Sequence, residues 1–229
     1  MKFDRIGNFT TPKTTNIVDR TSLTGRQSKA NSRKSFAYLI AKKLFDLVIS
    51  TLLLPVFLIC CVFLSVLNPF FNRGPLFFVQ KRMGRDCNHF RAIKFRTMSC
   101  VSEMTRGADD PLEVNRITPL GGFLRRTRLD EIPQIINVLR GEMSLIGPRP
   151  DCYEHAETYL ATIPGYRERH AALPGISGLA QTELGYVQGI EATRIKVVAD
   201  LDYINRQSIR LDMWIFWRTL QIVAGRAGA

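Results

Sequence analysis

The longest hydrophobic stretch of the chain runs from Leu47 to Leu67 and contains no charged residue. At a rise of about 1.5 Å per residue, a helix of this length covers the hydrocarbon thickness of a bilayer, about 30 Å. Pro55 lies inside the stretch and predicts a kink, because proline removes a helix hydrogen bond and clashes with the preceding turn. The pattern therefore predicts a kinked membrane helix over residues 36–72.

This hydrophobic segment can be interpreted in three ways. A cleaved signal peptide is disfavoured, because the stretch begins far from Met1 and is not followed by small residues. Basic residues flank both ends, Lys42 and Lys43 before it and Arg73 after it, so no charge asymmetry orients a span. We therefore expect a re-entrant hairpin with both ends in the cytoplasm. A simple kinked span that places the rest of the chain on the far side is the alternative.

Shorter patterns predict a β-hairpin and an amphipathic helix. Two β-prone stretches, 75–79 and 90–95, are separated by a turn at 83–88. Hydrophobic residues at 129, 132, 135, 136 and 139 then follow helical spacing. Pro133 fits this helix only in its first turn, where its missing N–H has no helical partner, so we expect the helix to begin near residues 127–130.

The segment 209–223 holds both tryptophans of the chain and one very hydrophobic face. Aromatic side chains favour the headgroup level of a bilayer, so a helix lying in that plane fits the pattern. A helix packed on the core of a domain has the same periodicity, and the spacing does not choose between the two.

The charge of the chain is uneven. Lys and Arg number 32 against 20 Asp and Glu, a net charge of +12, and most of this excess lies before residue 44. We expect residues 1–35 to form a disordered basic tail that lies against anionic lipid, and no nucleic acid to be bound, because the excess is not on a folded face. The five cysteines and three histidines follow no metal-ligand spacing.

The candidate catalytic residues lie at the start of the predicted helix. Asp130 and Glu131 are adjacent carboxylates, and Arg125, Arg126 and Arg128 precede them. An ionised aspartate can act as a nucleophile or as a magnesium ligand, and arginines bind phosphate oxygens in pairs. An ordinary acidic helix start with solvated arginines gives the same spacing. P-loop and Rossmann glycine motifs are absent from the sequence, so nucleotide binding of those types is not indicated.

Five groups of motifs follow one another from about Lys42 to the C-terminus. They are Gly-Pro-Leu-Phe-Phe (74–78) with Gln-Lys-Arg-Met-Gly (80–84), Lys-Phe-Arg-Thr-Met (94–98), the stretch 117–134 that contains Arg-Leu-Asp-Glu-Ile-Pro-Gln, the stretch 137–150 that ends in Gly-Pro-Arg-Pro, and Pro-Gly-Ile-Ser-Gly-Leu-Ala-Gln (174–181). In this order they resemble the bacterial sugar transferase family, the monotopic phosphoglycosyl transferases that begin capsule, exopolysaccharide and O-antigen synthesis.

The resemblance implies an α+β fold with a kinked re-entrant membrane helix hairpin (36–72) and a cytoplasmic catalytic domain (73–229). That domain would combine a β-hairpin and amphipathic helices at the membrane interface around a small core. The expected location is the bacterial inner membrane. The resemblance also implies a short-form member, with a basic tail in place of a long N-terminal membrane domain.

The resemblance further implies a reaction. Asp130 and Glu131 would form a catalytic pair that binds Mg²⁺, and a phosphosugar would be held covalently on the aspartate. The donor would be a UDP-sugar, by resemblance a hexose, and the acceptor undecaprenyl phosphate. Substrate-binding residues would be Arg125, Arg149, Lys94, Arg96 and Asp200. Two alternatives stay open: a membrane-anchored scaffold without catalysis, and direct transfer with Asp130 only a metal ligand.

The sequence departs from the family pattern at three places. The helix break falls at Leu54-Pro55, where many members have a Ser-Pro pair, and Ser177 stands where threonine is usual. Gln181 is followed by Thr-Glu-Leu-Gly-Tyr, a segment that differs from the common family sequence. The sequence therefore does not identify the sugar.

Overall fold

The computed structural model describes residues 36–100, 113–184 and 189–225, which all belong to one contact unit, 35–229. The predicted basic tail, residues 1–35, lies outside the described residues. The described part combines helices with two small sheets, which confirms the α+β class. The division at residue 73 into a membrane segment and a catalytic domain stays a prediction.

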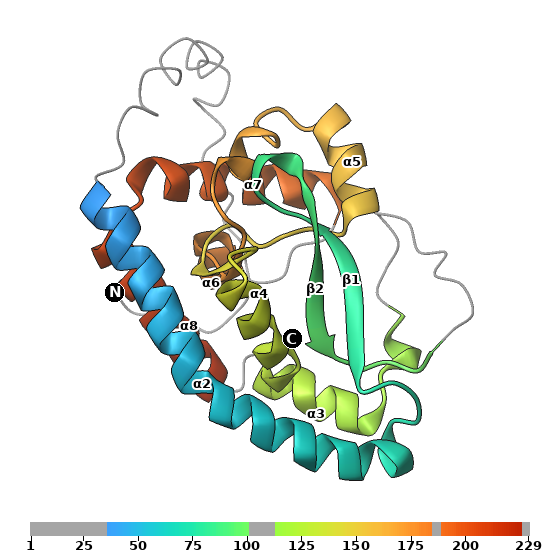
Figure 1. Ribbon diagram of the computed structural model, residues 1–229. Helices are drawn as coiled ribbons and strands as arrows, with labels where there is room; N and C mark the ends of the chain where they lie inside the picture. The colour runs from blue at the N-terminus through green and yellow to red at the C-terminus, as the bar shows by residue number, and fades with distance from the viewer. Residues whose placement is uncertain (1–35, 101–112, 185–188, 226–229) are drawn as a thin grey trace, which may run out of the picture. The chain divides into compact units, whose positions relative to one another are not determined.

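The hydrophobic segment forms one helix, α2 (Phe36–Phe71), with Pro55 and Pro69 inside it. Figure 1 shows that the two halves of α2 run in different directions, in agreement with the predicted kink. Among the described residues, α2 is the one helix long and apolar enough to cross a membrane, and only 17% of its most hydrophobic window is buried. The core helix of a soluble protein would be mostly buried, so this exposed surface favours contact with lipid.

The predicted hairpin is present with longer strands. β1 (Phe77–Met83) and β2 (His89–Phe95) pair antiparallel from Phe77–Phe95 to Met83–His89. The turn between them contains η2 (Arg85–Cys87), where Asp86 and Cys87 have positive φ angles. The prediction placed the first strand over 75–79, whereas β1 begins at Phe77 and continues past residue 79. Pairing with β2 carries the strand on to Met83.

The helix predicted over 129–139 is divided in two. After η3 (Val114–Arg116) and α3 (Pro119–Thr127), Arg128 adopts a left-handed conformation with φ 58°. A 3₁₀ helix, η4 (Leu129–Gln134), follows and leads into the short α4 (Ile135–Leu139). The start near 127–130 is confirmed, but a single amphipathic helix was wrong. The first turns are tighter than α-helical and contain Pro133, which donates no backbone hydrogen bond.

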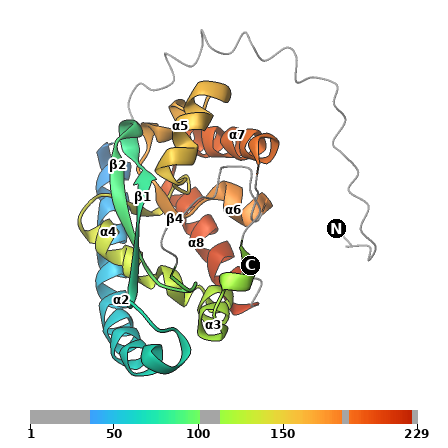
Figure 2. The same ribbon diagram turned by 90° about the vertical axis from the view of Figure 1, so that its right-hand side faces the viewer.

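The remaining elements follow α4 along the chain, from Ser144 to Ala224. β3 (Ser144–Ile146) and β4 (Gly175–Ser177) form a parallel pair. The other elements are helical: α5 (Tyr153–Thr162), η5 (Glu168–Ala171), α6 (Leu179–Leu184), α7 (Ile190–Arg206) and α8 (Ile209–Ala224). Figures 1 and 2 place α5 and α7 at one end of the unit and α3, with the C-terminal half of α2, at the other.

Hydrophobic packing joins the C-terminal half of α2 to the elements that carry the candidate site. One buried cluster consists of Phe57, Leu64, Phe95, Leu124 and Ile135. These side chains come from α2, β2, α3 and α4, and Leu129 and Ile132 of η4 pack against them, so α2 and η4 share one core.

The N-terminal half of α2 is held by polar contacts that we call the anchor cluster: Tyr38, Lys42, Tyr203 and Asp212. Lys42 Nζ donates to Asp212 Oδ2 at 2.9 Å and to the carbonyl oxygen of Ile146 at 2.9 Å. The hydroxyls of Tyr38 and Tyr203 donate to the two oxygens of Asp212 at 3.1 and 2.8 Å. The cluster fixes α2 to α7, α8 and β3.

Helix α8 packs on the core of the unit, as one of the two alternatives expected, and its position at a membrane interface stays a prediction. Ile215 and Asp212 are buried against the rest of the unit, whereas Trp214, Trp217 and Leu220 are exposed. One face of α8 therefore packs on the core, and a second hydrophobic face remains uncovered by the described residues.

Candidate active site

The candidate site begins where α3 ends. The left-handed conformation of Arg128 ends α3, and its carbonyl oxygen accepts the backbone N–H of Glu131 at 3.2 Å. Asp130 and Glu131 therefore lie in the first turn of η4, with exposed fractions of only 8% and 7%. Sequence reasoning placed both carboxylates at the start of a longer helix. The element is a short 3₁₀ helix, and the charges that face Glu131 come from other segments.

Two cations hold Glu131. Lys94 of β2 donates from Nζ to Glu131 Oε1 at 2.7 Å. Arg149, which follows β3, contacts both carboxylate oxygens, Oε2 from Nη1 at 3.2 Å and Oε1 from Nη2. Burial alone raises the pKa of Glu131, but Arg149 and Lys94 outweigh it and hold this pKa well below its usual value. Glu131 is thus a fixed anion.

Asp130 has a different environment. Within the described part of the chain, its Oδ1 atom is buried and has no hydrogen-bond partner. Burial, followed by the neighbouring charge of Glu131, raises the pKa of Asp130 to about 6, against the opposing effect of Lys94, Arg149 and Arg125. The two adjacent carboxyl groups therefore have pKa values shifted in opposite directions, a pattern that often marks catalytic pairs.

Arg125 lies close to this pair. Its Nε atom donates to Thr97 Oγ1 at 2.9 Å, and its charge lowers the pKa of Asp130. The approach of α3 to Thr97 requires Gly121, because a Cβ atom there would lie 1.9 Å from the carbonyl oxygen of Thr97. The structure thus brings Arg125, Lys94 and Arg149 together with the carboxylate pair.

Two other predicted substrate-binding residues have protein partners instead. Arg96 is buried and donates to the carbonyl oxygens of Pro75 at 2.7 Å and Met98 at 3.0 Å and to Asn72 Oδ1 at 2.9 Å, which ties the end of α2 to the segment after β2. Asp200 of α7 forms a fully buried ion pair with Arg169 at 2.7 Å. Their assignment to substrate binding stays a prediction.

Sequence reasoning missed the residues that support Arg149. Arg169, Asp151 and Lys196 form an ion network with Asp200, in which Asp151 pairs with Arg169 at 2.8 Å and with Lys196 at 2.5 Å. Arg169 and Asp200 are buried, and the other two are partly buried. These residues lie far apart along the chain and share no period. The one available signal was Asp151, which directly follows the Pro-Arg-Pro motif.

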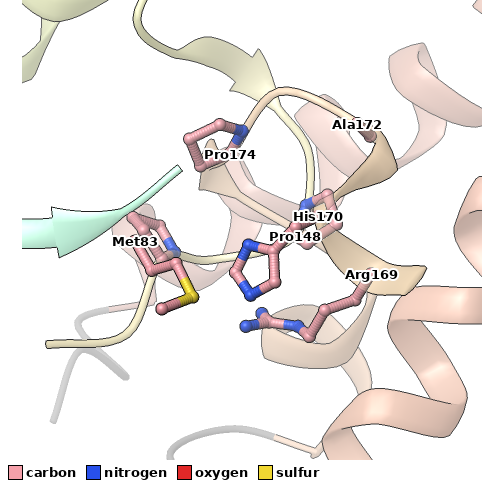
Figure 3. Close-up of a pocket in the computed structure, with 7 residues that line it drawn as sticks. Met83, Pro148, Arg169, His170, Ala172 and Pro174 are labelled. Atoms are coloured by element: carbon pink, nitrogen blue, oxygen red, sulfur yellow. The ribbon is translucent and has the colours of Figure 1, made fainter. Parts of the chain in front are cut away.

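A small pocket opens beside this network. Met83, Pro148, Pro150, Arg169, His170, Ala172 and Pro174 line it (Figure 3), and none of these belongs to the carboxylate pair. His170 Nδ1 lies 3.0 Å from the carbonyl oxygen of Gly84, and its Nε2 atom is buried without a partner among the described residues. Burial, followed by the charge of Arg169, lowers the pKa of His170 to about 4.

The predicted magnesium ion can be tested against the donor atoms present. The described ranges contain no group of three or more His, Cys, Asp or Glu that could hold a metal by themselves. Mg²⁺ in phosphoryl-transfer sites, however, is bound by one or two carboxylates together with substrate phosphates and water. The unpaired oxygen of Asp130 fits that mode of binding.

Comparison with known proteins agrees with the motifs. Residues 37–226 match the model of a family described as bacterial sugar transferase. The UDP-N-acetylgalactosamine-undecaprenyl-phosphate N-acetylgalactosaminephosphotransferase of Aeromonas hydrophila is 37% identical over 193 residues, which are 84% of this chain and 45% of that protein. The UDP-glucose:undecaprenyl-phosphate glucose-1-phosphate transferase of Caulobacter vibrioides is 37% identical over 80% of this chain and 67% of its own length.

A third relative is close to this chain in length. The exopolysaccharide production protein PSS of Rhizobium leguminosarum bv. phaseoli is 35% identical over 80% of this chain and 94% of its own length. The chain covers about half or less of several other relatives, such as the glucose-1-phosphate transferase of Escherichia coli, of which it covers 39%.

Proposed function

The chain belongs to the bacterial sugar transferase family, and on that premise we propose that it transfers a sugar 1-phosphate from a UDP-sugar to undecaprenyl phosphate and releases UMP. The names of its relatives in Aeromonas and Caulobacter state this type of reaction for those proteins. We propose a hexose donor, since glucose is named for several relatives. The reaction would be the first membrane step of polysaccharide synthesis.

The carboxylate of Asp130 carries this proposal. It combines a buried oxygen without a partner among the described residues with a pKa raised to about 6, beside a second carboxylate that two cations neutralise. A structural carboxylate would have both oxygens bonded, because an unsatisfied buried acceptor costs about 1–3 kcal/mol. An oxygen kept unbonded at this cost suits a group that bonds to substrate.

In the first step, Asp130 attacks the phosphorus atom next to the sugar. A bond forms between the carboxylate oxygen and this phosphorus, the bridging P–O bond to UMP breaks, and UMP leaves with the bond's electrons. Arg125, Lys94 and Arg149 supply positive charge at the place where the diphosphate must lie. Without these cations, the approach of a carboxylate to a diphosphate would be repulsive.

In the second step, an oxygen of undecaprenyl phosphate attacks the same phosphorus. The bond to Asp130 breaks, the carboxylate is restored and the lipid diphosphate sugar leaves. Division into two steps means that the donor and the lipid phosphate need not react with each other directly. Glu131, the second predicted ligand of Mg²⁺, has both oxygens bonded to Lys94 and Arg149. Asp130 together with the substrate phosphates would therefore hold the ion, which would offset negative charge on those phosphates.

We further propose that α2 is re-entrant and that the catalytic residues face the cytoplasm at the inner membrane. The exposed hydrophobic side chains of α2 and the uncovered Trp214 and Trp217 of α8 support placement in and on the lipid surface. The core that α2 shares with η4 would hold Asp130 near the depth of lipid phosphates. Encounters with the acceptor would then occur within the membrane plane rather than in solution.

A single-turnover experiment tests the covalent step. Purified protein with Mg²⁺ and a radiolabelled UDP-sugar, but without lipid, should release about one equivalent of UMP and retain the sugar label on the protein. Asp130→Asn should retain no label. UMP release that requires added undecaprenyl phosphate would instead support direct transfer, and no UMP release from any donor would support a scaffold.

The donor is identified by a panel of UDP-sugars assayed with undecaprenyl phosphate present. We expect a UDP-hexose to give the highest kcat/KM for UMP release. A preference for UDP-N-acetylgalactosamine, the donor named for the Aeromonas relative, would overturn the hexose assignment and leave the reaction type unchanged.

A further inference from the structure

The segment that presents Arg149 is fixed by its backbone. Four consecutive carbonyl oxygens, from residue 148 to residue 151, each accept a hydrogen bond, and the donors come from β1, η5 and β4. The four bonds are Gly175 N to Pro148 O at 3.0 Å, Arg169 Nη2 to Arg149 O at 2.7 Å, Arg82 Nη1 to Pro150 O at 2.9 Å and Met83 N to Asp151 O at 3.1 Å. Because the prolines at 148 and 150 also restrict φ, little backbone freedom remains around Arg149.

Arg169 donates the bond to Arg149, the residue of this segment whose side chain contacts Glu131. The side chain of Arg169 is only 1% exposed. The guanidinium donates to Asp200 from Nε at 2.8 Å, to Asp151 from Nη1 at 2.8 Å and to the carbonyl oxygen of Arg149 from Nη2 at 2.7 Å. Asp151 is held in turn by Tyr166 at 2.8 Å and by Lys196.

The side chain of Arg149 leaves this fixed backbone toward Glu131. Its guanidinium contacts both oxygens of Glu131 and donates from Nη1 to the carbonyl oxygen of Ile176 at 3.2 Å. A shift of the Arg149 backbone would therefore move the charge that faces the carboxylate pair. Arginines that bind phosphate in two-point contacts lose affinity when their geometry changes.

We propose that Arg169 is a positioning residue that sets Arg149 for binding of the donor diphosphate, and that Asp200 acts on the reaction through Arg169 rather than by contact with substrate. The proposal rests on the proposed function, in which Arg149 supplies charge to the diphosphate. It also explains why Asp200 lies in a buried ion pair away from solvent. In this proposal, the ion pair with Asp200 holds Arg169 in the position from which it donates to the carbonyl oxygen of Arg149.

The substitution Arg169→Lys tests the geometry of the side chain at this position while its positive charge is kept. An ammonium group keeps the positive charge between Asp151 and Asp200, but it lacks the planar fork that reaches the two carboxylates and the carbonyl oxygen of Arg149 together. We expect Arg169→Lys to raise the KM for the UDP-sugar about tenfold, with a smaller change in kcat. Tyr166→Phe is the matched control, because it removes a hydrogen bond to Asp151 and leaves the bond to Arg149 in place.

A double-mutant cycle decides whether Arg169 acts through Arg149. If it does, the donor KM of Arg149→Gln/Arg169→Lys should equal that of Arg149→Gln alone, since the group to be positioned is already lost. A merely stabilising role predicts lower thermal stability with a wild-type donor KM, or effects on KM that multiply in the double variant. Either result would overturn the proposal.

A second measurement does not depend on turnover. In protein labelled with ¹⁵N-arginine, the guanidinium resonance of Arg149 is identified by its loss in Arg149→Lys. We expect this resonance to shift or broaden in Arg169→Lys and to stay unchanged in Tyr166→Phe. An unchanged resonance in Arg169→Lys would contradict the positioning role. If the wild-type protein releases no UMP, the proposed function fails, but the resonance still tests the position of Arg149.

Discussion

Two buried aspartates, Asp130 and Asp212, illustrate how similar surroundings serve different ends. Each lies near a lysine and next to α2 or its core. Both oxygens of Asp212 accept hydrogen bonds, from Lys42, Tyr38 and Tyr203, whereas Oδ1 of Asp130 has no partner in the described ranges. Burial beside a cation is therefore common to both aspartates. They differ in the completeness of their hydrogen bonds, and the catalytic role proposed for Asp130 rests on that difference.

Substitution of Asp130 should give the largest effect. Asp130→Asn removes the proposed nucleophile, so we expect UMP release to fall at least about a thousandfold. The melting temperature should not fall, because the neutral amide avoids the cost of a buried charge. Thermal unfolding and UMP release on the same preparation measure both. Substantial activity in this variant would contradict the catalytic assignment and place Asp130 with Asp212.

Asp212→Asn should show the opposite pattern. It leaves the partly buried Lys42 ammonium without the carboxylate of its ion pair, and breaking a buried pair costs roughly 3–5 kcal/mol of stability. We expect a clear fall in melting temperature, with UMP release per folded molecule within about twofold of wild type. Asp202→Asn is the control, because its pair with Arg206 is exposed and such pairs contribute about 0–1 kcal/mol. A catalytic defect in Asp212→Asn without loss of stability would remove the distinction between the two clusters.

Glu131→Gln should have an intermediate effect on activity. The neutral amide no longer balances Lys94 and Arg149, so the position of both cations changes. Partners that orient groups in a site typically account for tenfold to a hundredfold, and we expect kcat/KM to fall by about that amount. Steady-state kinetics with the UDP-sugar measures this loss. A fall as large as that of Asp130→Asn would mean that Glu131 itself takes part in bond formation.

His170 tests whether an unpaired buried atom is enough to mark a catalytic group. Its pKa is lowered to about 4, while an unfolded histidine has a pKa of about 6.5. Between these values the unfolded state binds more protons, so stability should fall as the pH falls from 6.5 to 4, by up to about 3 kcal/mol. His170→Gln should flatten this part of the stability curve, measured by thermal unfolding, and leave UMP release at pH 7.5 within about twofold. A large loss of activity at pH 7.5 would assign His170 a direct role.

The sequence predicted the features that depend on local pattern. The uncharged run from Leu47 to Leu67 indicated α2, and two β-prone stretches separated by a turn indicated the hairpin. β1 nevertheless extends to Met83, because its polar residues pair with β2. The division of 129–139 was missed, since the left-handed Arg128 and the 3₁₀ turns follow from packing and not from hydrophobic spacing.

The candidate site was predictable to a smaller extent. The motifs indicated Asp130, Glu131, Arg125, Lys94 and Arg149, which the structure brings together, but they also grouped Arg96 and Asp200 with them. Those two residues are bonded within the protein, and such partners are set by contacts between segments that are distant in sequence. No period or spacing reveals that Arg169 reaches the carbonyl oxygen of Arg149.

A substitution of Gly121 would affect the candidate site indirectly, through the position of helix α3. The position has no room for even one methyl group, because a Cβ atom would lie 1.9 Å from the Thr97 carbonyl oxygen. Alanine there would push α3 away from Thr97, and the same helix carries Arg125, whose Nε atom bonds the Thr97 hydroxyl. In a survey of variants, this chemically mild exchange would be scored as loss of a residue of the site, although its direct effect is a clash with the backbone of Thr97.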